Sequence, residues 1–465
     1  MENVQIGVIL KKGPQPWAIV QQKDGKAEIG LSGIWHTEEK VSGAQVYARI
    51  VREETAETVT DWIAATMEEG RAWSVKMEGV PAGGLYRIET SLQVNGNPAL
   101  EWAMRGDMIH HVGVGDLWII AGQSNAAGYG KGPVNDPPEP GIHLFRNSNR
   151  WDLATHPFNE STNTMHAENR ETANPGHSPF LAFARILKRE LGYPIGLVQT
   201  ALGGSPLQAW NPNEEGLLYR NMLNIAREAG GSARGVVWYQ GCSDCYPGMS
   251  ETYADRFGEM VARWRRDLGD PELPFATVQL NRCTSPATEE DDRAWSQVRE
   301  HQRAAANAIP HATVIPAIDC PLSDEIHNSP AGNLLIGERM ARAVLADVYG
   351  RAIHARAPEI SEARRVAGAE GKSAVELTFD HVGGYLVSIG PKEPAFAIED
   401  EEGAVQVEGW SISGNRAIVV HLARELRGQA YAHGGYGRNP AVYYPVDSLT
   451  YMPTLAFYRF PVAAR

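Results

Sequence analysis

The sequence is short of basic residues, of long apolar runs and of cysteine. Its 465 residues include 43 Lys+Arg against 56 Asp+Glu, so the formal net charge is -13. This balance argues against nucleic-acid binding, which depends on basic side chains placed against phosphates, and against an anionic membrane surface as a partner. No stretch approaches the roughly 20 apolar residues that span a bilayer, and Met1 to Pro14 lacks the pattern of a secretory leader. We therefore expect a cytoplasmic protein without membrane contact.

Four cysteines in 465 residues are too few for a disulfide scaffold. Cys242 and Cys245 form a CxxC pair, which is typical of half of a zinc site or of a redox pair. A zinc site needs a second ligand pair at matching spacing, whereas Cys283 and Cys320 stand alone. We interpret all four as ordinary thiols and expect no metal and no organic cofactor.

The composition that is present, with 43% hydrophobic and 21% charged residues, is typical of a folded protein of two or three domains. From Val4 to Met108 apolar and polar residues mostly alternate, which predicts an N-terminal β-domain over residues 1–108. After Gly350 helical periodicity disappears, which predicts a C-terminal β-region over 353–465. Both regions are expected to be β-sandwich-like. They are either separate or packed together, and the pattern allows both arrangements.

Residues 109–352 have a different pattern, in which short continuous apolar runs alternate with segments of helical spacing. Such runs are typical of buried parallel strands, and they cover 112–122, 194–200, 235–241, 275–280 and 312–318. The helical segments run from about 180 to 192, 215 to 229, 251 to 268, 291 to 308 and 332 to 348. This alternation predicts a three-layer α/β/α domain with a parallel sheet.

The loop Gly122-Gln123-Ser124-Asn125 follows the first buried strand directly. Open α/β sheets bind ligands at the carboxyl ends of their strands, so Ser124 is a candidate nucleophile; a small polar turn is the alternative interpretation. His327, in the loop after the last buried strand, reaches the same edge and is the candidate base. Asp324 is positioned to accept the imidazole Nδ1 proton and to stabilise the imidazolium, with Asp319 and Glu325 as substitutes.

Acyl transfer also requires hydrogen-bond donors aimed at a developing oxyanion. The loop Leu202-Gly203-Gly204-Ser205-Pro206 follows the second strand, and its glycines let backbone N–H groups approach a ligand closely. Trp238-Tyr239-Gln240-Gly241 follows the third strand and offers a side-chain amide. Each segment alone is typical of a turn, but four such loops after four strands favour a site.

In this order and context, GQSN, GGSPLQAW, WYQG and DEIH resemble the blocks of the sialate O-acetylesterase-like carbohydrate esterases, a branch of the SGNH (GDSL-type) hydrolase superfamily. The resemblance covers about residues 115–350 and implies an SGNH-hydrolase, flavodoxin-like fold. It implies a catalytic triad of Ser124, His327 and Asp324. It also implies an oxyanion hole made by the N–H groups of Ser124 and Gly203 with the Gln240 side chain. The branch carries glutamate where this chain has Cys242, which alters substrate contacts, arginine pairing or loop rigidity.

Six further residues are candidate substrate contacts, because they lie in or near the loops at the carboxyl ends of the predicted strands. They are Gln123, Asn125, Gly204, Trp210, Trp295 and Arg299. Aromatic faces stack on sugar rings and arginine binds carboxylates, although tryptophan at helical spacing is more often core. His166 and His177, in the long loop after the first strand, are interpreted as solvated rather than as substrate contacts. The proline-rich segment 134–142 is interpreted as a rim loop without chemistry.

The expected function is that of a serine esterase that removes O-acetyl groups from carbohydrates, either acetylated oligosaccharides such as xylo-oligosaccharides or O-acetyl sialic acid. A homo-oligomer is compatible with the sequence. Two alternatives stay open: a carbohydrate-binding protein on an esterase fold that has lost its chemistry, and a serine esterase or thioesterase acting on other short acyl chains.

Overall fold

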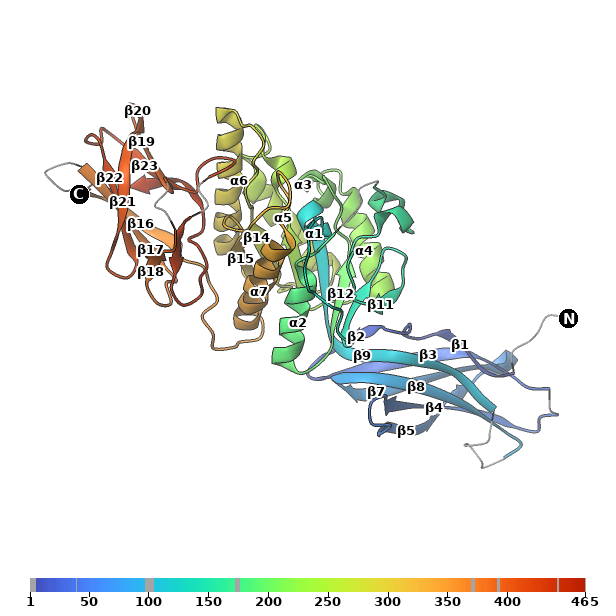
Figure 1. Cartoon of the computed structure of the whole chain (residues 1–465). Helices are drawn as coiled ribbons and strands as arrows, with labels where there is room; N and C mark the ends of the chain where they lie inside the picture. Colours follow the sequence, from blue (N-terminus) through green and yellow to red (C-terminus); the bar gives the residue numbers. More distant parts are fainter. Residues whose placement is uncertain are drawn as a thin grey trace.

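The computed structural model describes residues 6–38, 40–96, 104–171, 176–368, 373–390, 394–440 and 443–464. The chain forms an N-terminal β-region, a central α/β region and a C-terminal β-region, arranged in a row (Figure 1). The two β-regions lie at opposite ends of the α/β region, so they are separate and do not pack together. Each region has its own cluster of buried apolar side chains.

The N-terminal region is built mainly from antiparallel strands, and the short strand β2 pairs with β9 in parallel. One sheet has the order β1-β3-β7-β6, and the strands β4, β5 and β8 join β9 in a second sheet. Their alternating pattern arises because each strand has one face on the shared core and one in water. The strands are β1 (Gly7–Lys12), β2 (Ile19–Gln21), β3 (Lys26–His36), β4 (Ala44–Arg52), β5 (Thr58–Ala64), β6 (Thr66–Met67), β7 (Ala72–Pro81) and β8 (Gly83–Val94), with a 3-10 turn η1 (Glu69–Arg71).

The boundary predicted between residues 108 and 109 falls inside one continuous strand, β9 (Met104–Gly122). The first part of β9 pairs with β8, and its second part pairs with β12 and β13 in the central sheet. The change from alternating to continuous apolar residues therefore marks a change of environment within a strand. The N-terminal β-region and the α/β region share this strand, which ties them together without a linker.

The central sheet has the order β11-β10-β12-β9-β13-β14-β15, and all of these strands are parallel except the edge strand β11. The five predicted buried strands are present. The sequence analysis missed β10 and β11, because they are short and lie next to the segment interpreted as a loop. The bounds are β10 (Ile142–Phe145), β11 (Trp151–Leu153), β12 (Ile195–Gln199), β13 (Gly235–Tyr239), β14 (Phe275–Gln279) and β15 (Ala312–Pro316).

Helices cover the sheet in two groups, with α2 packed on α7 and with α5 packed on α6. Local signals explain their ends: Thr288 and Asp291 form a capping box at α6, and Ser329 caps α7 with Pro330 at its first position. The helices are α1 (Ser124–Ala127), α2 (Phe180–Leu191), α3 (Leu207–Trp210), α4 (Leu217–Ala229), α5 (Tyr253–Asp267), α6 (Glu289–Ala308) and α7 (Pro330–Asp347), with 3-10 turns η2 (Ser161–Asn163), η3 (Ala167–Asn169) and η4 (Cys242–Asp244). This is the three-layer α/β/α fold that the pattern predicted.

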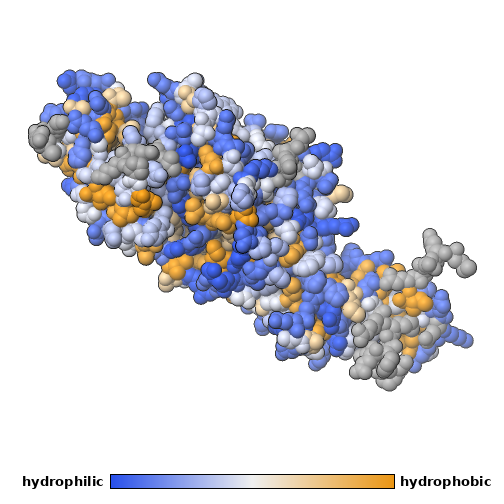
Figure 2. Space-filling view, in the orientation of Figure 1, coloured by the Kyte–Doolittle hydropathy of each residue, from blue (hydrophilic) through white to orange (hydrophobic). Residues whose placement is uncertain are grey.

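The C-terminal region consists of small antiparallel sheets around a separate core that includes Phe379, Trp410 and Phe457. Its strands are β16 (Glu359–Ala367), β17 (Ser373–Asp380), β18 (Leu386–Ser388), β19 (Phe396–Asp400), β20 (Gly403–Val405), β21 (Val407–Ser413), β22 (Ala417–Leu422), β23 (Ala430–Gly434), β24 (Pro445–Asp447) and β25 (Phe457–Val462). Within the described ranges, no helix is both long and apolar enough to cross a membrane. The molecular face in Figure 2 is mainly hydrophilic, with scattered apolar patches.

A buried histidine of β10, His143, predicts a pH dependence of stability. The Nδ1 atom of His143 lies 2.7 Å from the Trp17 carbonyl oxygen, and its Nε2 atom accepts the Gly141 N–H at 3.3 Å. Both contacts are satisfied only by the neutral ring with its proton on Nδ1, and burial lowers the pKa of His143 to about 4. The unfolded chain binds this proton below a pH of about 6.5 and the folded chain does not, so stability falls as the pH drops through that value.

The expected loss at pH 5 from His143 alone is about 2 kcal/mol of unfolding free energy. Urea unfolding at pH 7 and pH 5 measures it, with His143→Asn beside the wild type. The asparagine variant should lose less stability on acidification, because the other histidines are common to both proteins. Equal losses in the two proteins would show that His143 does not couple folding to pH.

Candidate active site

Ser124 is presented by a sharp turn at the end of β9. Gly122 has a φ of +125°, and a Cβ at this position would overlap the Tyr239 carbonyl oxygen, so only glycine fits. The chain then enters α1, where Ser124 is the first residue. The N–H of a first helical residue has no intrahelical partner, so the Ser124 N–H makes no hydrogen bond within α1.

The structure brings Ser124, His327 and Asp324 together in one chain of hydrogen bonds, although Ser124 and His327 are 203 residues apart in the sequence. The Ser124 Oγ atom lies 2.8 Å from His327 Nε2, and His327 Nδ1 lies 2.8 Å from Asp324 Oδ2. The two substitutes considered for Asp324 are engaged elsewhere: Asp319 pairs with Arg339, and Glu325 accepts a hydrogen bond from Ser285. The arrangement can move a proton from the serine to the imidazole.

Asp324 is held in its ionised form. Burial raises the pKa of this carboxyl group. Hydrogen bonds from the backbone N–H groups of Ile326 and His327 and from the His327 side chain lower the pKa by more than burial raises it, so it lies below its usual value. Its Oδ1 atom accepts both N–H groups, at 2.9 and 2.7 Å, which leaves Oδ2 for the imidazole. The Asp324 side chain is 47% exposed, so the array lies in an open part of the surface.

Asn125 was a candidate substrate contact, and the structure corrects this prediction. It is buried, with its Oδ1 atom accepting the Asn328 N–H at 3.0 Å and its Nδ2 atom donating to the Ile326 carbonyl at 3.2 Å. Asn281 donates to the same Ile326 carbonyl at 2.7 Å. Asn125 therefore holds the backbone on both sides of His327 and positions the imidazole against Ser124.

Gln123 and Gln240 are also committed to the protein. The Gln123 Oε1 atom accepts the N–H groups of Gly241 and Ser243, so the residue joins two loops and does not face a substrate. Gln240 is fully buried, and its amide donates to Asp244 at 2.6 Å and to the Ser205 carbonyl at 3.2 Å. Both amide protons are used, so the prediction that Gln240 donates to an oxyanion is not met by this geometry.

The three larger candidate contacts lie in the core, contrary to the sequence-based prediction. Trp210 and Trp295 are buried, and the Trp210 indole donates to Ser205 Oγ. Arg299 is 1% exposed and donates to five backbone carbonyls, those of Leu280, Asn281, Gly435, Gly437 and Arg438. It joins α6 to the C-terminal region and does not bind a ligand. Of the six candidate substrate contacts, Gly204 is the exposed one, and it has a φ of +66°.

Glu171 and Tyr129 are site residues that the sequence analysis missed. The Glu171 Oε2 atom accepts the Gly203 N–H at 3.1 Å, and Glu171 Oε1 accepts the Asn159 amide at 2.5 Å. The Tyr129 ring packs on the His327 ring with centroids 5.1 Å apart, and burial and the Glu171 carboxylate raise the pKa of its hydroxyl. No local pattern distinguishes either residue from an ordinary loop residue.

The four cysteines are free thiols. Burial raises the pKa of Cys242 to about 12, with a further contribution from Cys283, and it also raises the pKa of Cys245. The Cys245 thiol donates to the Gly241 carbonyl within its own turn. A thiol of high pKa is a poor nucleophile and a poor metal ligand, so Cys242 and Cys245 are structural in this geometry.

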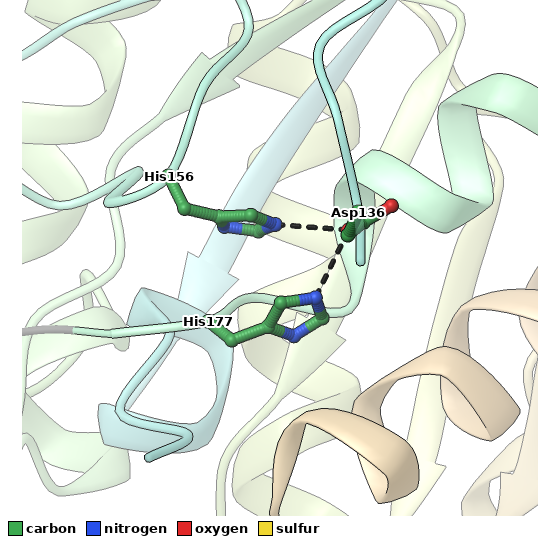
Figure 3. Close-up of side chains that lie close together, drawn as sticks. All are labelled: Asp136, His156 and His177. Atoms are coloured by element: carbon green, nitrogen blue, oxygen red, sulfur yellow. Dashed lines mark hydrogen bonds and ion pairs between the residues drawn. The ribbon is translucent and has the colours of Figure 1, made fainter. Parts of the chain in front are cut away.

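A cluster of Asp136, His156 and His177 lies in the loops after β9 (Figure 3). Both histidines donate from Nε2 to Asp136 Oδ2, at 3.0 and 2.9 Å, and Arg185 pairs with Asp136 Oδ1 at 2.6 Å. Burial raises the pKa of Asp136, but these three donors outweigh burial and hold the pKa well below its usual value. His177 is buried, so its interpretation as a solvated residue was wrong, and the proline-rich segment that carries Asp136 is anchored.

Within the described ranges, these three side chains are the group that could hold a metal ion, with ligand atoms within 4.8 Å of one another. A metal ion needs the lone pair of a histidine nitrogen. The Ser178 N–H donates to His156 Nδ1 at 3.3 Å, which leaves the ring proton on Nε2, facing Asp136. The arrangement therefore fits a hydrogen-bonded anchor better than an ion site. Since the His177 backbone pairs with Gly130, the anchor supports the segment that carries Tyr129.

The central region is a three-layer α/β/α domain that carries a Ser-His-Asp hydrogen-bond chain beside the carboxyl ends of its strands. The family model described as "carbohydrate esterase, sialic acid-specific acetylesterase" matches residues 114–346, half of the chain. The chain belongs to this family and is a carboxylic ester hydrolase that acts on O-acetyl esters of carbohydrates.

Related proteins agree with this assignment. A probable carbohydrate esterase of Arabidopsis thaliana is 29% identical over 255 residues, which are 50% of this chain and 90% of that protein. The human sialate O-acetylesterase is 23% identical over 344 residues, or 64% of this chain and 63% of the relative, so this chain spans less than two thirds of that protein. A solved carbohydrate acetylesterase from Xanthomonas citri has the same fold, with a TM-score of 0.67 and 22% identity over 97% of this chain and 99% of the other.

Proposed function

We propose that the protein is a serine esterase that removes acetyl groups from acetylated oligosaccharides or O-acetyl sialic acid through an acetyl-Ser124 intermediate. The observation that supports this proposal is the unbroken hydrogen-bond chain from Ser124 Oγ through His327 to Asp324. The residues on both sides of His327 are held by Asn125, so the imidazole cannot easily leave the serine. In the cytoplasm, the location that we propose, the substrate is an imported sugar.

The chemistry follows from this order of groups. His327 takes the Ser124 proton as the serine oxygen attacks the acetyl carbonyl, and Asp324 stabilises the imidazolium. The imidazolium then protonates the leaving sugar oxygen, which releases the sugar alcohol and leaves acetyl-Ser124. Water, deprotonated by His327, attacks this ester, and collapse of the second intermediate releases acetate and restores the serine.

The oxyanion formed in both steps needs donors, and the proposal assigns this role to the N–H groups of Ser124 and Gly203. The first is the N–H of the residue that opens α1, which no backbone group of that helical turn uses. The second is bound by Glu171 Oε2 in this structure, and the proposal requires an acetyl oxygen to displace that carboxylate oxygen. Gln240 has no part in this proposal, because its amide protons are used by Asp244 and Ser205.

The test is acetate release from acetylated xylo-oligosaccharides, acetylated mannans and O-acetyl sialic acids, with a small activated acetyl ester and a series of longer acyl esters beside them. We expect release from at least one acetylated sugar and a steep decline with acyl-chain length. Sugar binding without any release, with the activated ester also intact, would instead support the carbohydrate-binding alternative. Equal rates across the acyl series would support an esterase of broader acyl range.

A further inference from the structure

The side-chain amide of Asn281 binds the chain on both sides of His327. Its Nδ2 atom donates to the Ile326 carbonyl at 2.7 Å and to Asn328 Oδ1 at 3.1 Å. An amide nitrogen carries two protons, so both are used by the residues that flank the imidazole. Asn281 is fully buried, and hydrogen bonds away from water hold their partners more firmly than exposed ones do. The position of His327 therefore depends on the position of Asn281.

Asn281 is in turn held by Arg299, a buried residue of α6. The Arg299 guanidinium donates to the Asn281 carbonyl at 2.7 Å and to the Leu280 carbonyl at 3.0 Å. Its other hydrogen bonds reach three carbonyls of the C-terminal region, those of Gly435, Gly437 and Arg438. The five N–H groups of an arginine thus meet five carbonyls, two from the loop after β14 and three from the C-terminal region.

The loop between β14 and α6 lies between the C-terminal region and the loop that carries His327. On one side the Cys283 N–H donates to the Arg438 carbonyl at 3.0 Å, and on the other the Thr284 N–H donates to the Glu325 carbonyl at 2.8 Å. Figure 1 shows α6 on the side of the α/β region that faces the C-terminal region. An unbroken series of hydrogen bonds therefore connects the C-terminal region with the base of the triad.

We propose that the C-terminal β-region positions the general base of this esterase, with Arg299 and Asn281 as the positioning residues. This inference rests on the proposed function. Arg299 fixes the loop after β14 against the C-terminal region, and Asn281 transfers that position to the residues beside His327. Proton transfer requires the imidazole within hydrogen-bond reach of Ser124, where it lies at 2.8 Å, and a displacement of about 1 Å can cost 10²-fold in rate.

Asn281→Ala should lower kcat between about 10- and 100-fold and leave KM within a few-fold of the wild type. The reason is that Asn281 is buried, so its loss displaces the base without removing a surface contact with substrate. Initial rates with 4-nitrophenyl acetate and with the best acetylated sugar measure both constants. Urea unfolding of each variant gives the accompanying loss of stability.

The matched control is Gln279→Ala, which removes a buried amide two residues before Asn281. The Gln279 amide exchanges two hydrogen bonds with the backbone of Ala456 in the C-terminal region, at 2.9 and 2.8 Å, and donates to the Arg299 carbonyl at 3.0 Å. It binds the same two regions but not the residues that flank His327. The control should lose a similar amount of stability and keep kcat within a few-fold of the wild type.

Arg299→Lys tests the connection to the C-terminal region. Lysine keeps the charge but has three donors, so at least two of the five carbonyls lose their partner. We expect kcat to fall about tenfold. The double variant Arg299→Lys, Asn281→Ala should be no slower than Asn281→Ala alone, because both residues act through the same loop. Losses that multiply in the double variant would contradict this connection.

A fluorophosphonate probe separates a displaced base from an unfolded protein. The Ser124 oxygen attacks its phosphorus and displaces fluoride, and His327 takes the serine proton. The number of labelled sites counts intact active sites, while the labelling rate reports the base. Asn281→Ala should reach the stoichiometry of the wild type at a rate 10- to 100-fold lower, and Arg299→Lys supplies the same readout where Asn281→Ala does not fold.

The inference is overturned by labelling of Asn281→Ala at the wild-type rate with reduced stoichiometry, which means partial unfolding. It is also overturned by an equal loss of kcat in Gln279→Ala, or by a change confined to KM. Failure of the proposed function looks different. In that case the wild type releases no acetate from any ester, or the probe labels Ser124→Ala as fast as the wild type.

Discussion

Replacing Ser124 with alanine is expected to lower kcat for acetate release by about 10⁶-fold, the loss seen when a serine nucleophile is removed from a triad. The Ser124 Oγ atom is the only atom of the side chain that reaches His327, at 2.8 Å, and alanine deletes it. The fold should not change, because the Ser124 backbone holds the turn and its side chain fills little space. Initial rates with an activated acetyl ester and with the best acetylated sugar give the measurement.

The matched control is Ser243→Ala, a serine near the same loops whose hydroxyl donates to the Gly204 carbonyl at 3.1 Å. It should retain activity within a few-fold of the wild type. Rapid acid quench of the wild-type reaction can trap an acetyl group on the protein. Mass spectrometry that locates this group on the peptide with Ser124 would identify the intermediate directly. Rates like those of the wild type in Ser124→Ala would refute the nucleophile assignment.

Asp324→Asn is expected to lower kcat by about 10⁴-fold, as in triads where asparagine replaces the acid. The Asp324 carboxylate accepts three N–H groups, from the Ile326 and His327 backbones and from His327 Nδ1. The asparagine oxygen will remain with the two backbone donors, so its amide nitrogen faces the imidazole. The His327 ring then carries its proton on Nε2 and cannot accept one from Ser124.

Glu325→Gln is the control for Asp324→Asn, because Glu325 is the adjacent acidic residue and bonds to Ser285 instead of to the imidazole. It should change kcat by no more than a few-fold. Equal losses in Asp324→Asn and Glu325→Gln would point to a general effect of the loop and would contradict a specific role for Asp324.

Much of the fold could be predicted because it depends on local patterns. The run from Val112 to Gly122 is apolar on both faces, which only a central strand requires, and Gly192 ends the helix that Phe180 begins. The prediction failed where one element spans two environments. The strand β9 changes its pattern near residue 112 without a break, so the boundary predicted between residues 108 and 109 falls inside a continuous strand.

In the candidate site, too, some residues could be predicted from local patterns and others could not. Ser124, Asp324 and His327 could be chosen because each stands at the carboxyl end of a predicted parallel strand or a few residues beyond one, and such ends meet at one edge. The substrate contacts could not be chosen in this way. Asn125 and Gln240 have suitable side chains for binding a sugar or an oxyanion, but their hydrogen-bonding groups are used by partners on other loops.

The sequence by itself determined five strands of the central sheet with the helices between them, and the loops that carry Ser124, Asp324 and His327, because periodicity and strand ends are local properties. Only the tertiary structure decided which polar groups remain available to a substrate. Arg299 is saturated by carbonyls from the loop after β14 and from the C-terminal region, and the Gly203 N–H is bound in this structure by Glu171 from a loop 32 residues earlier. Whether a donor is free depends on every partner that folding brings within about 3 Å, and no pattern along the chain records those partners.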